Sequence, residues 1–253
     1  MKSLYTFSSF DGTTCIWGRE EGEYEVIAAL EGHENEVKRV CFSPAEELLA
    51  TCGRDKSVWI WAVEKNNEFE CVSVLQEHNQ DVKCVVWHPT SPILVSCGYD
   101  DLIKLYAEEE YDWECYETLE GHQSTVWEVS FNSKGNKMVS CSEDGNLKVW
   151  TSVSNASLRK PSYSCTATVA GLHTRVVYSL TWNCNDELLS TGAGDNFIRI
   201  FKKAAVENEN FRLMDLSDAH KNDVNCVRWH PVVPNILASC GDDKTIRIWK
   251  YQY

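Results

Sequence analysis

The chain has 253 residues, 43% of them hydrophobic, and its formal net charge is −14 with an isoelectric point near 4.9. This acidity excludes nucleic-acid binding as a main role, because phosphate recognition needs a clustered excess of Lys and Arg. The amino terminus lacks the apolar core of a secretory signal, and no apolar run is long enough for a membrane span. We therefore expect a cytoplasmic protein, with the nucleus as a second location, and no nucleic-acid or membrane partner.

Twelve cysteines occur without a secretory signal, so the reducing cytosol should keep them as thiols. No Cys-x-x-Cys and no Cys/His pair with zinc-ligand spacing is present. Four cysteines stand three residues before an Asp, each in a different repeat, too far apart to share one metal: Cys52, Cys97, Cys141 and Cys240. We predict buried thiols that fill the core, and neither a metal nor a cofactor.

One layout recurs along almost the whole chain. An Asp precedes an aromatic by six residues in six places, with 44 to 51 residues between successive Asp residues: Asp11/Trp17, Asp55/Trp61, Asp100/Tyr106, Asp144/Trp150, Asp195/Phe201 and Asp243/Trp249. A His stands 22 or 23 residues before each of the last five: His33, His78, His122, His173 and His220. A fixed period of this length predicts a β-propeller of four-stranded blades.

Short segments of alternating apolar residues predict the strands within each repeat. Two lie between the His and the Asp, a third follows the Asp, and a fourth, more polar one comes next. The count is five full sets plus an incomplete hairpin, or 22 strands, which predicts an all-β propeller of about five and a half blades with an incomplete ring. The predicted parts of this single domain, 1–253, are 1–22 (a partial blade), 23–62, 63–107, 108–151, 152–202 and 203–250.

Each full repeat also contains a polar set of His, Ser or Thr, and Asp, usually with a Trp or Tyr. The sets are His33, Thr51, Asp55, Trp61; His78, Ser96, Asp100, Tyr106; His122, Ser140, Asp144, Trp150; His173, Thr191, Asp195; and His220, Ser239, Asp243, Trp249. These are the residue types of a nucleophilic triad. Because an active site is not copied five times along one chain, we favour a structural network and predict no enzyme. Phe201 cannot donate a hydrogen bond, so the set around His173 should be the weakest.

Two series of residues should lie at the rim where loops leave the strands. One series immediately precedes each Asp, and the other follows each His by five positions. The predicted protein-binding rim consists of Arg54, Tyr99, Trp127, Tyr178, Phe10, Lys38 and Lys83. Several are residue types enriched in binding hot spots. The alternative, that they are ordinary half-buried rim residues, stays open. An acidic strip from Glu108 to Glu114 is interpreted as a solvated loop.

Several segments resemble a known family. GHENEVKRVCFSP, LLATCGRDKSVWIW, HNQDVKCVVWHP, LEGHQSTVWEVSF, AHKNDVNCVRWHP and the closing IWKYQ are similar to the WD-repeat subunit of the cytosolic iron-sulfur protein assembly targeting complex. The resemblance implies a seven-bladed, non-catalytic scaffold that joins other subunits of the complex and helps deliver clusters to cytosolic and nuclear apoproteins. It also implies that the scaffold itself need not hold the cluster, and that Arg54 corresponds to an exposed family arginine.

The chain departs from that family in two respects. The opening blade and a half is missing, so we expect a shortened isoform or an abbreviated gene model, and self-association through the open ring. Where some relatives carry Leu-Tyr-Arg, a cochaperone-binding motif type, this chain has Leu105-Tyr106-Ala107, which lacks the guanidinium. The alternative function is substrate receptor of a ubiquitin ligase or another interaction scaffold, although no repeat here ends in the Trp-Asp-x-Arg common among such receptors.

Overall fold

The computed structural model describes residues 4–20, 22–64, 68–110, 112–153, 159–203 and 211–252. Its described part contains 22 β-strands and no helix. The chain divides into two compact units. The first contains residues up to 120 together with 159–160, and the second contains the rest of the described chain. The prediction of one domain over 1–253 stays a prediction.

The first unit holds three antiparallel sheets, ordered β1-β2-β3, β4-β5-β6-β7 and β8-β9-β10-β11. Its strands are β1 (Tyr5–Ser8), β2 (Thr14–Glu20), β3 (Glu23–Leu30), β4 (Val37–Phe42), β5 (Leu48–Gly53), β6 (Val58–Val63), β7 (Phe69–Leu75), β8 (Val82–Trp87), β9 (Ile93–Gly98), β10 (Ile103–Glu108) and β11 (Trp113–Leu119).

The second unit also holds three antiparallel sheets, ordered β12-β13-β14-β15, β16-β17-β18-β19 and β20-β21-β22. Its strands are β12 (Val126–Phe131), β13 (Lys137–Ser142), β14 (Leu147–Ser152), β15 (Tyr163–Val169), β16 (Val177–Trp182), β17 (Leu188–Ala193), β18 (Phe197–Lys203), β19 (Phe211–Asp218), β20 (Val224–Trp229), β21 (Ile236–Gly241) and β22 (Ile246–Lys250).

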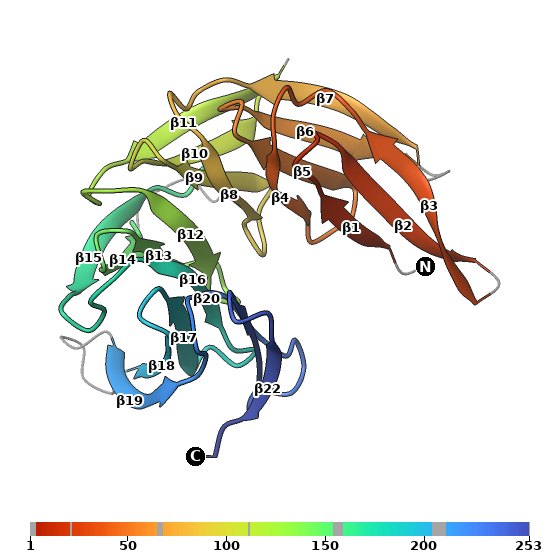
Figure 1. Ribbon diagram of the computed structural model, residues 1–253. Helices are drawn as coiled ribbons and strands as arrows, with labels where there is room; N and C mark the ends of the chain where they lie inside the picture. The colour runs from red at the N-terminus through yellow and green to blue at the C-terminus, as the bar shows by residue number, and fades with distance from the viewer. Residues whose placement is uncertain are drawn as a thin grey trace. The chain divides into compact units, whose positions relative to one another are not determined.

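Within each unit the sheets follow one another as blades (Figure 1). In the first unit β4 contacts both β1 and β8, and in the second β16 contacts both β12 and β20. The predicted all-β fold of blade-like sheets is confirmed. The polar strand that opens each predicted range from 23–62 onward pairs with the third strand of the preceding range, so the sheets are offset by one strand from those ranges. The first and last sheets consequently have three strands each.

The turn after the second strand of each full repeat has one backbone conformation, and the first hairpin shares it. The residue following each Asp of the repeat has a positive φ, between 64° and 87°, as in Gly12, Lys56 and Asn196. The Asp carboxylate accepts the backbone N–H two residues on, for example Ser57 N–H to Asp55 at 3.1 Å. This local hydrogen bond stabilises the left-handed residue, which is why a non-glycine is tolerated there.

The core lies between successive sheets of a unit. Alternate residues of the third strand, such as Val58 and Ile60, are fully buried and pack in one cluster with Val82 and Val85 of the next sheet. The clusters of the second unit repeat this arrangement, with Leu147 and Val149 beside Val177 and Leu180. This packing explains the alternating apolar pattern of the strands, and it fixes the turns at their ends.

Candidate protein-binding surface

A hydrogen-bonded chain of four side chains anchors the turn in the second sheet. Trp61 donates its indole N–H to Thr51 at 3.1 Å, and His33 contacts Thr51 through Nε2 at 2.9 Å and Asp55 through Nδ1 at 2.7 Å. Because a carboxylate only accepts, Nδ1 carries the proton, so the Thr51 hydroxyl donates to Nε2 of the neutral ring. Burial alone would raise the pKa of Asp55, but the hydrogen bonds from His33 and Ser57 outweigh it and lower the pKa to about 2.

The same chain forms in three further sheets. His78, His122 and His220 contact their Asp through Nδ1 at 2.8 to 2.9 Å and their Ser through Nε2 at 2.6 to 2.8 Å. The fourth member lies 2.8 to 3.0 Å from the Ser oxygen; the three are Tyr106, Trp150 and Trp249. Each hydroxyl is at most 3% exposed and is already hydrogen-bonded on both sides. Such a hydroxyl cannot reach a substrate, so the geometry is that of a structural support.

The set around His173 is built differently. His173 Nδ1 lies 3.9 Å from Asp195, and the buried guanidinium of Arg199 inserts between them, 2.9 Å from Nδ1 and 2.8 to 3.0 Å from the carboxylate. Arginine only donates, so here Nδ1 accepts and Nε2–H donates to Thr191, which reverses the direction of the chain. Burial, followed by the charge of Arg199, lowers the pKa of His173 to about 3.

These anchored turns bring the two predicted rim series together. In each full repeat the residue before the Asp donates its backbone N–H to the carbonyl three residues after the His. The pairs are Arg54 to Glu36, Tyr99 to Asp81, Glu143 to Thr125, Gly194 to Val176 and Asp242 to Asp223, at 2.8 to 3.0 Å. The approach is close: a Cβ atom on Gly53 would lie only 2.8 Å from the carbonyl oxygen of Glu36.

In the first unit five predicted residues form one surface, which we call the first rim patch: Phe10, Lys38, Arg54, Lys83 and Tyr99. Lys38 Nζ lies 4.6 Å from the ring centroid of Phe10, and Lys83 Nζ lies 3.7 Å from that of Tyr99. Phe10 is 80% exposed, and the Arg54 side chain is 57% exposed. The patch combines cationic groups with aromatic faces, which is a frequent composition of binding hot spots.

Acidic side chains that the sequence analysis did not single out hold this patch in place. Arg54 donates to Glu36 at 3.0 Å, and this bond raises the pKa of the arginine. The pKa of Glu36 is lowered, first by its own backbone N–H and further by Arg54. Lys83 lies 3.5 Å from Asp81. Glu36 and Asp81 both stand three residues after a His. This shared position in the repeat could have identified them from the sequence as rim residues.

In the second unit the two predicted aromatic residues form the second rim patch. Trp127 and Tyr178 meet edge to face, with ring centroids 5.1 Å apart. Tyr178 donates its hydroxyl to Asp223 at 3.2 Å, and Arg175 lies 3.4 Å from the same carboxylate. Burial, and then Asp223, raise the pKa of Tyr178. Asp223 again stands three residues after a His, whereas no predicted series included Arg175.

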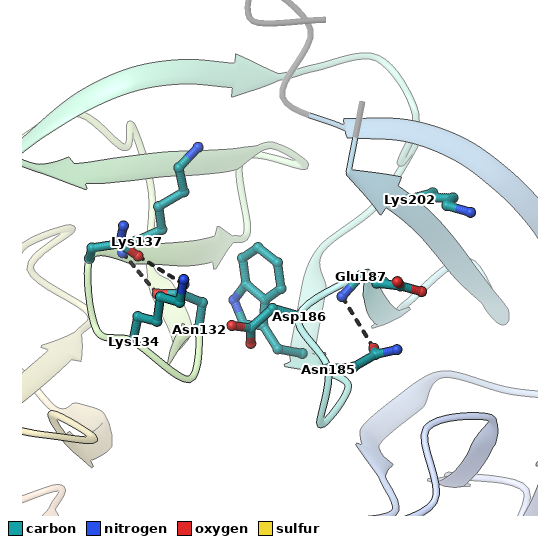
Figure 2. A pocket seen from close by; sticks show the side chains of 9 residues that line it. Asn132, Lys134, Lys137, Asn185, Asp186, Glu187 and Lys202 are labelled. Carbon is teal, nitrogen blue, oxygen red and sulfur yellow. Dashed lines mark hydrogen bonds between the residues drawn. The ribbon is translucent and has the colours of Figure 1, made fainter. Parts of the chain in front are cut away.

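A pocket of about 460 Å³ lies in the second unit, outside both rim patches. It is lined by the turns between β12 and β13 and between β16 and β17, together with Lys202 of β18 (Figure 2). Lysines line it beside Asp186 and Glu187, and the Asp186 carboxylate already accepts two hydrogen bonds from Ser133. This mixture of charges selects no single ligand class, and the sequence analysis singled out none of these residues.

The remaining sequence predictions fall at buried or unremarkable places. Cys52, Cys97 and Cys141 are fully buried, and burial raises the pKa of Cys52 well above the ordinary value. The prediction of a buried thiol is wrong for Cys240, which is only half-buried. Leu105 and Tyr106 lie in the core of β10, so the tripeptide that replaces Leu-Tyr-Arg is not at the surface. Within the described ranges no three His, Cys, Asp or Glu side chains gather as metal ligands, and no helix is suited to cross a membrane.

Comparison with known proteins assigns the repeats. The family model of the WD domain, G-beta repeat, matches residues 24–62, 69–107, 113–151, 163–202 and 212–250. A probable cytosolic iron-sulfur protein assembly protein Ciao1 of Culex quinquefasciatus is 42% identical over 258 residues, which cover 97% of this chain and 76% of the relative. A Caenorhabditis elegans CIAO1 homolog is 39% identical over 97% of this chain and 75% of its own length.

Another relative matches over a shorter stretch. The probable Ciao1 protein of Aedes aegypti is 44% identical over 162 residues. This match covers 59% of the present chain and 48%, about half, of the length of that relative. Both the blade architecture and the near full-length similarity to the Culex protein agree with the resemblance seen in the sequence. The chain is a non-catalytic WD-repeat protein and belongs to the family of the cytosolic iron-sulfur protein assembly proteins.

Proposed function

We propose that the protein is a scaffold of the cytosolic iron-sulfur protein assembly machinery and helps insert clusters into cytosolic and nuclear apoproteins by holding partner proteins at its rim. The observation that carries the proposal is its family membership, through relatives named for that process over 97% of the chain. The cytosol is the compartment in those names, and the acidic, repeat-built chain fits a role in protein contacts.

The partners of this chain are proteins of the same assembly machinery. The open question for the proposal is which of these proteins bind and at which surface. Other subunits of the targeting complex and iron-sulfur apoproteins are the proposed partners. The first rim patch supports this assignment because it combines the exposed Arg54 guanidinium with exposed Phe10 and the paired Lys83 and Tyr99. Arg54 is the central residue of the proposal, because Glu36 orients its guanidinium while more than half of the side chain stays in solvent.

Without partners, the isolated chain is expected to self-associate through apolar residues at its two three-stranded sheets. Phe7 is 60% exposed on β1, and Ile246 is 79% exposed on β22. Contiguous exposed apolar surface of more than roughly 400 Å² marks interaction or aggregation sites. Light scattering over a concentration series tests this, and a monomer at every concentration would contradict it.

The scaffold is tested by quantitative affinity capture from cytosol. The wild-type chain is compared with Arg54→Glu and with Arg212→Glu, a matched charge reversal at an exposed arginine of β19 away from the rim patches. We expect iron-sulfur targeting subunits and apoproteins with the wild type and Arg212→Glu, and their loss with Arg54→Glu. Capture of ubiquitin-ligase subunits instead would support the alternative function. Equal capture by all three chains would remove Arg54 from the interface.

A further inference from the structure

Another pocket, of about 300 Å³, lies in the first unit. The turn between β4 and β5 lines one side of it, and the turn between β8 and β9 lines the other. Its place in the fold matches that of the pocket in the second unit, because each lies between successive sheets beside the tryptophan nine residues after a His, Trp87 or Trp182. The first rim patch lies at the opposite strand ends, since Lys38 is near the start of β4 and Arg54 follows the end of β5.

Apolar side chains form most of the wall of this pocket. Among the described residues that line it, six of ten are apolar and one, Glu47, is charged. The buried Trp87 indole donates its N–H to the Cys41 carbonyl at 3.2 Å, so this donor is already used. We call the site the proline pocket; its apolar members are Pro44, Ala45, Leu48, Trp87, Pro89 and Pro92.

The proline pocket is largely pre-formed. Proline and alanine, whose side chains have almost no rotamer freedom to lose, provide four of its six apolar members. The first residue of each turn holds that turn in place. The Ser43 hydroxyl accepts the N–H of Leu48 at 3.1 Å, and His88 Nδ1 accepts the N–H groups of Thr90 and Ser91 at 3.2 and 3.0 Å. Binding at this site therefore orders little of the protein.

The size and the wall of the proline pocket favour an aromatic anchor. A volume of about 300 Å³ is at the lower limit for whole small ligands, but it accommodates one large side chain. Phe, Tyr and Trp bury about 150–250 Å² each and dominate interface energetics. Trp87 already meets Trp113 edge to face with centroids 5.5 Å apart, and such ring pairs contribute beyond the area they bury. An aromatic side chain of a partner would add a further ring beside Trp87.

Acidic residues flank the proline pocket. Glu47 lines it and Glu46 precedes it, and both are exposed. Their backbone is fixed, because the Glu46 N–H donates to the Ser43 carbonyl at 2.9 Å and the Glu47 carbonyl accepts from Val63 at 2.9 Å. The net charge of −14 adds an attraction for cationic segments over longer distances. A basic residue next to the aromatic anchor therefore complements this site, whereas an acidic one is repelled.

We infer that the proline pocket is a docking site for a segment of a partner protein that inserts one aromatic side chain and carries basic residues directly beside it. The aromatic ring supplies most of the affinity, and the charges select the partner and speed its encounter. The inference does not rest on the proposed function. Because the proline pocket and the first rim patch lie at opposite strand ends, the same sheets can hold one protein at each.

The probe is the peptide Ser-Gly-Phe-Arg-Arg-Gly-Ser with blocked ends and 4-fluorophenylalanine as its aromatic residue. Fluorine NMR of the peptide in the presence of the full chain reports binding as broadening of its resonance, even when binding is weak. One anchor on a flexible peptide gives an expected Kd of about 0.1–1 mM. Unlabelled competitor peptides test the chemistry. Ala in place of Phe should weaken competition at least about tenfold, and Glu in place of both Arg residues about threefold to tenfold.

Protein variants test the pocket itself. Ala45→Trp fills it from an exposed position of the turn and should weaken binding at least about tenfold. Lys134→Trp is the matched control, because Lys134 holds the same place in the turn between β12 and β13, and it should bind like the wild type. Glu47→Gln removes the charge at nearly constant size and should weaken binding about twofold to fivefold. Thermal melts confirm that each variant is folded.

Four results would each overturn the inference. They are a probe resonance that the wild-type chain leaves unchanged, equal binding by Ala45→Trp and Lys134→Trp, equal competition by the alanine peptide, and equal competition by the glutamate peptide. Loss of binding with Ala45→Trp alone, together with the two weaker competitors, would support it.

Discussion

One substitution made at two equivalent positions tests whether the buried polar chains stabilise the sheets as described. Thr51→Val and Thr191→Val both replace a fully buried hydroxyl by a methyl group of similar shape. Thr51 accepts from Trp61 and donates to His33, whereas Thr191 only accepts from His173, because Phe201 stands where the others have a donor. Thr51→Val therefore leaves two buried polar groups without a hydrogen-bond partner, the Trp61 indole N–H and His33 Nε2. Thr191→Val leaves one, His173 Nε2–H.

The magnitude follows from that difference. A buried donor or acceptor left without its partner costs about 1–3 kcal/mol. Thr51→Val should accordingly lower the free energy of unfolding by about 2–6 kcal/mol and Thr191→Val by about 1–3 kcal/mol. In a chain of this size each kcal/mol shifts the melting temperature by about 2–4 °C.

Urea unfolding followed by tryptophan fluorescence and circular dichroism measures both variants against the wild type. The comparison uses the midpoints at unchanged slope, since a changed slope would signal altered compactness or an intermediate. If the two units unfold separately, Thr51→Val should shift the transition of the first unit and Thr191→Val that of the second. An equal loss for the two variants, or a larger loss for Thr191→Val, would show that the Trp61 indole does not depend on Thr51.

Three other buried groups give further expectations. The pKa of His173 in the folded protein, about 3, lies below its ordinary value of 6.5, so the unfolded chain binds this proton at a higher pH than the folded chain does. The free energy of unfolding should therefore be highest above pH 6.5 and should fall by about 2 kcal/mol at pH 5. Urea titrations at a series of pH values measure this decrease, and the His173→Gln variant should lack it. Cys165 should react with a thiol reagent in the folded protein and Cys52 only after unfolding, as read by peptide mass spectrometry. Removing the guanidinium partner of the buried Glu128 carboxylate by Arg228→Met should lower the free energy of unfolding by about 2–3 kcal/mol, as measured in thermal melts, although Ser179 and the Leu180 N–H still donate to it. Adding Glu128→Gln should recover part of this loss.

The fold was predictable from the sequence because the same pattern of polar and apolar residues recurs in each repeat. The spacing of Asp55 and Trp61, and of His33 before them, recurs at nearly constant distance, and such recurrence is produced by a unit that packs against its own copies. The alternating apolar residues then located the strands, and the polar fourth strand of each repeat marked the outer edge. The predicted count of 22 strands agrees with the 22 strands found among the described residues.

What the sequence did not reveal are contacts in which a side chain substitutes for the usual partner. Because Phe201 has no hydrogen-bond donor, the sequence predicted a weaker hydrogen-bond network around His173. The local sequence pattern did not predict that the Arg199 guanidinium would insert between His173 and Asp195. Lys104 and Lys148 hold the same strand position as Arg199 and reach outward to threonines instead. The choice depends on side-chain length and on the room left at the turn, which only the three-dimensional arrangement decides.

The anchored turns also support the proposal that binding residues concentrate at two positions of each repeat. The Asp carboxylate, the left-handed residue after it and the His network fix the backbone, so substitutions among these residues would leave buried polar groups without partners. The residue before the Asp and the residue five after the His are not members of this network, so we expect changes there to leave its hydrogen bonds in place. In the first unit these positions are cationic and aromatic around Arg54, and in the second Trp127 meets Tyr178 edge to face. One rigid framework can therefore present different chemistry from each blade, which is what a scaffold for several partners requires.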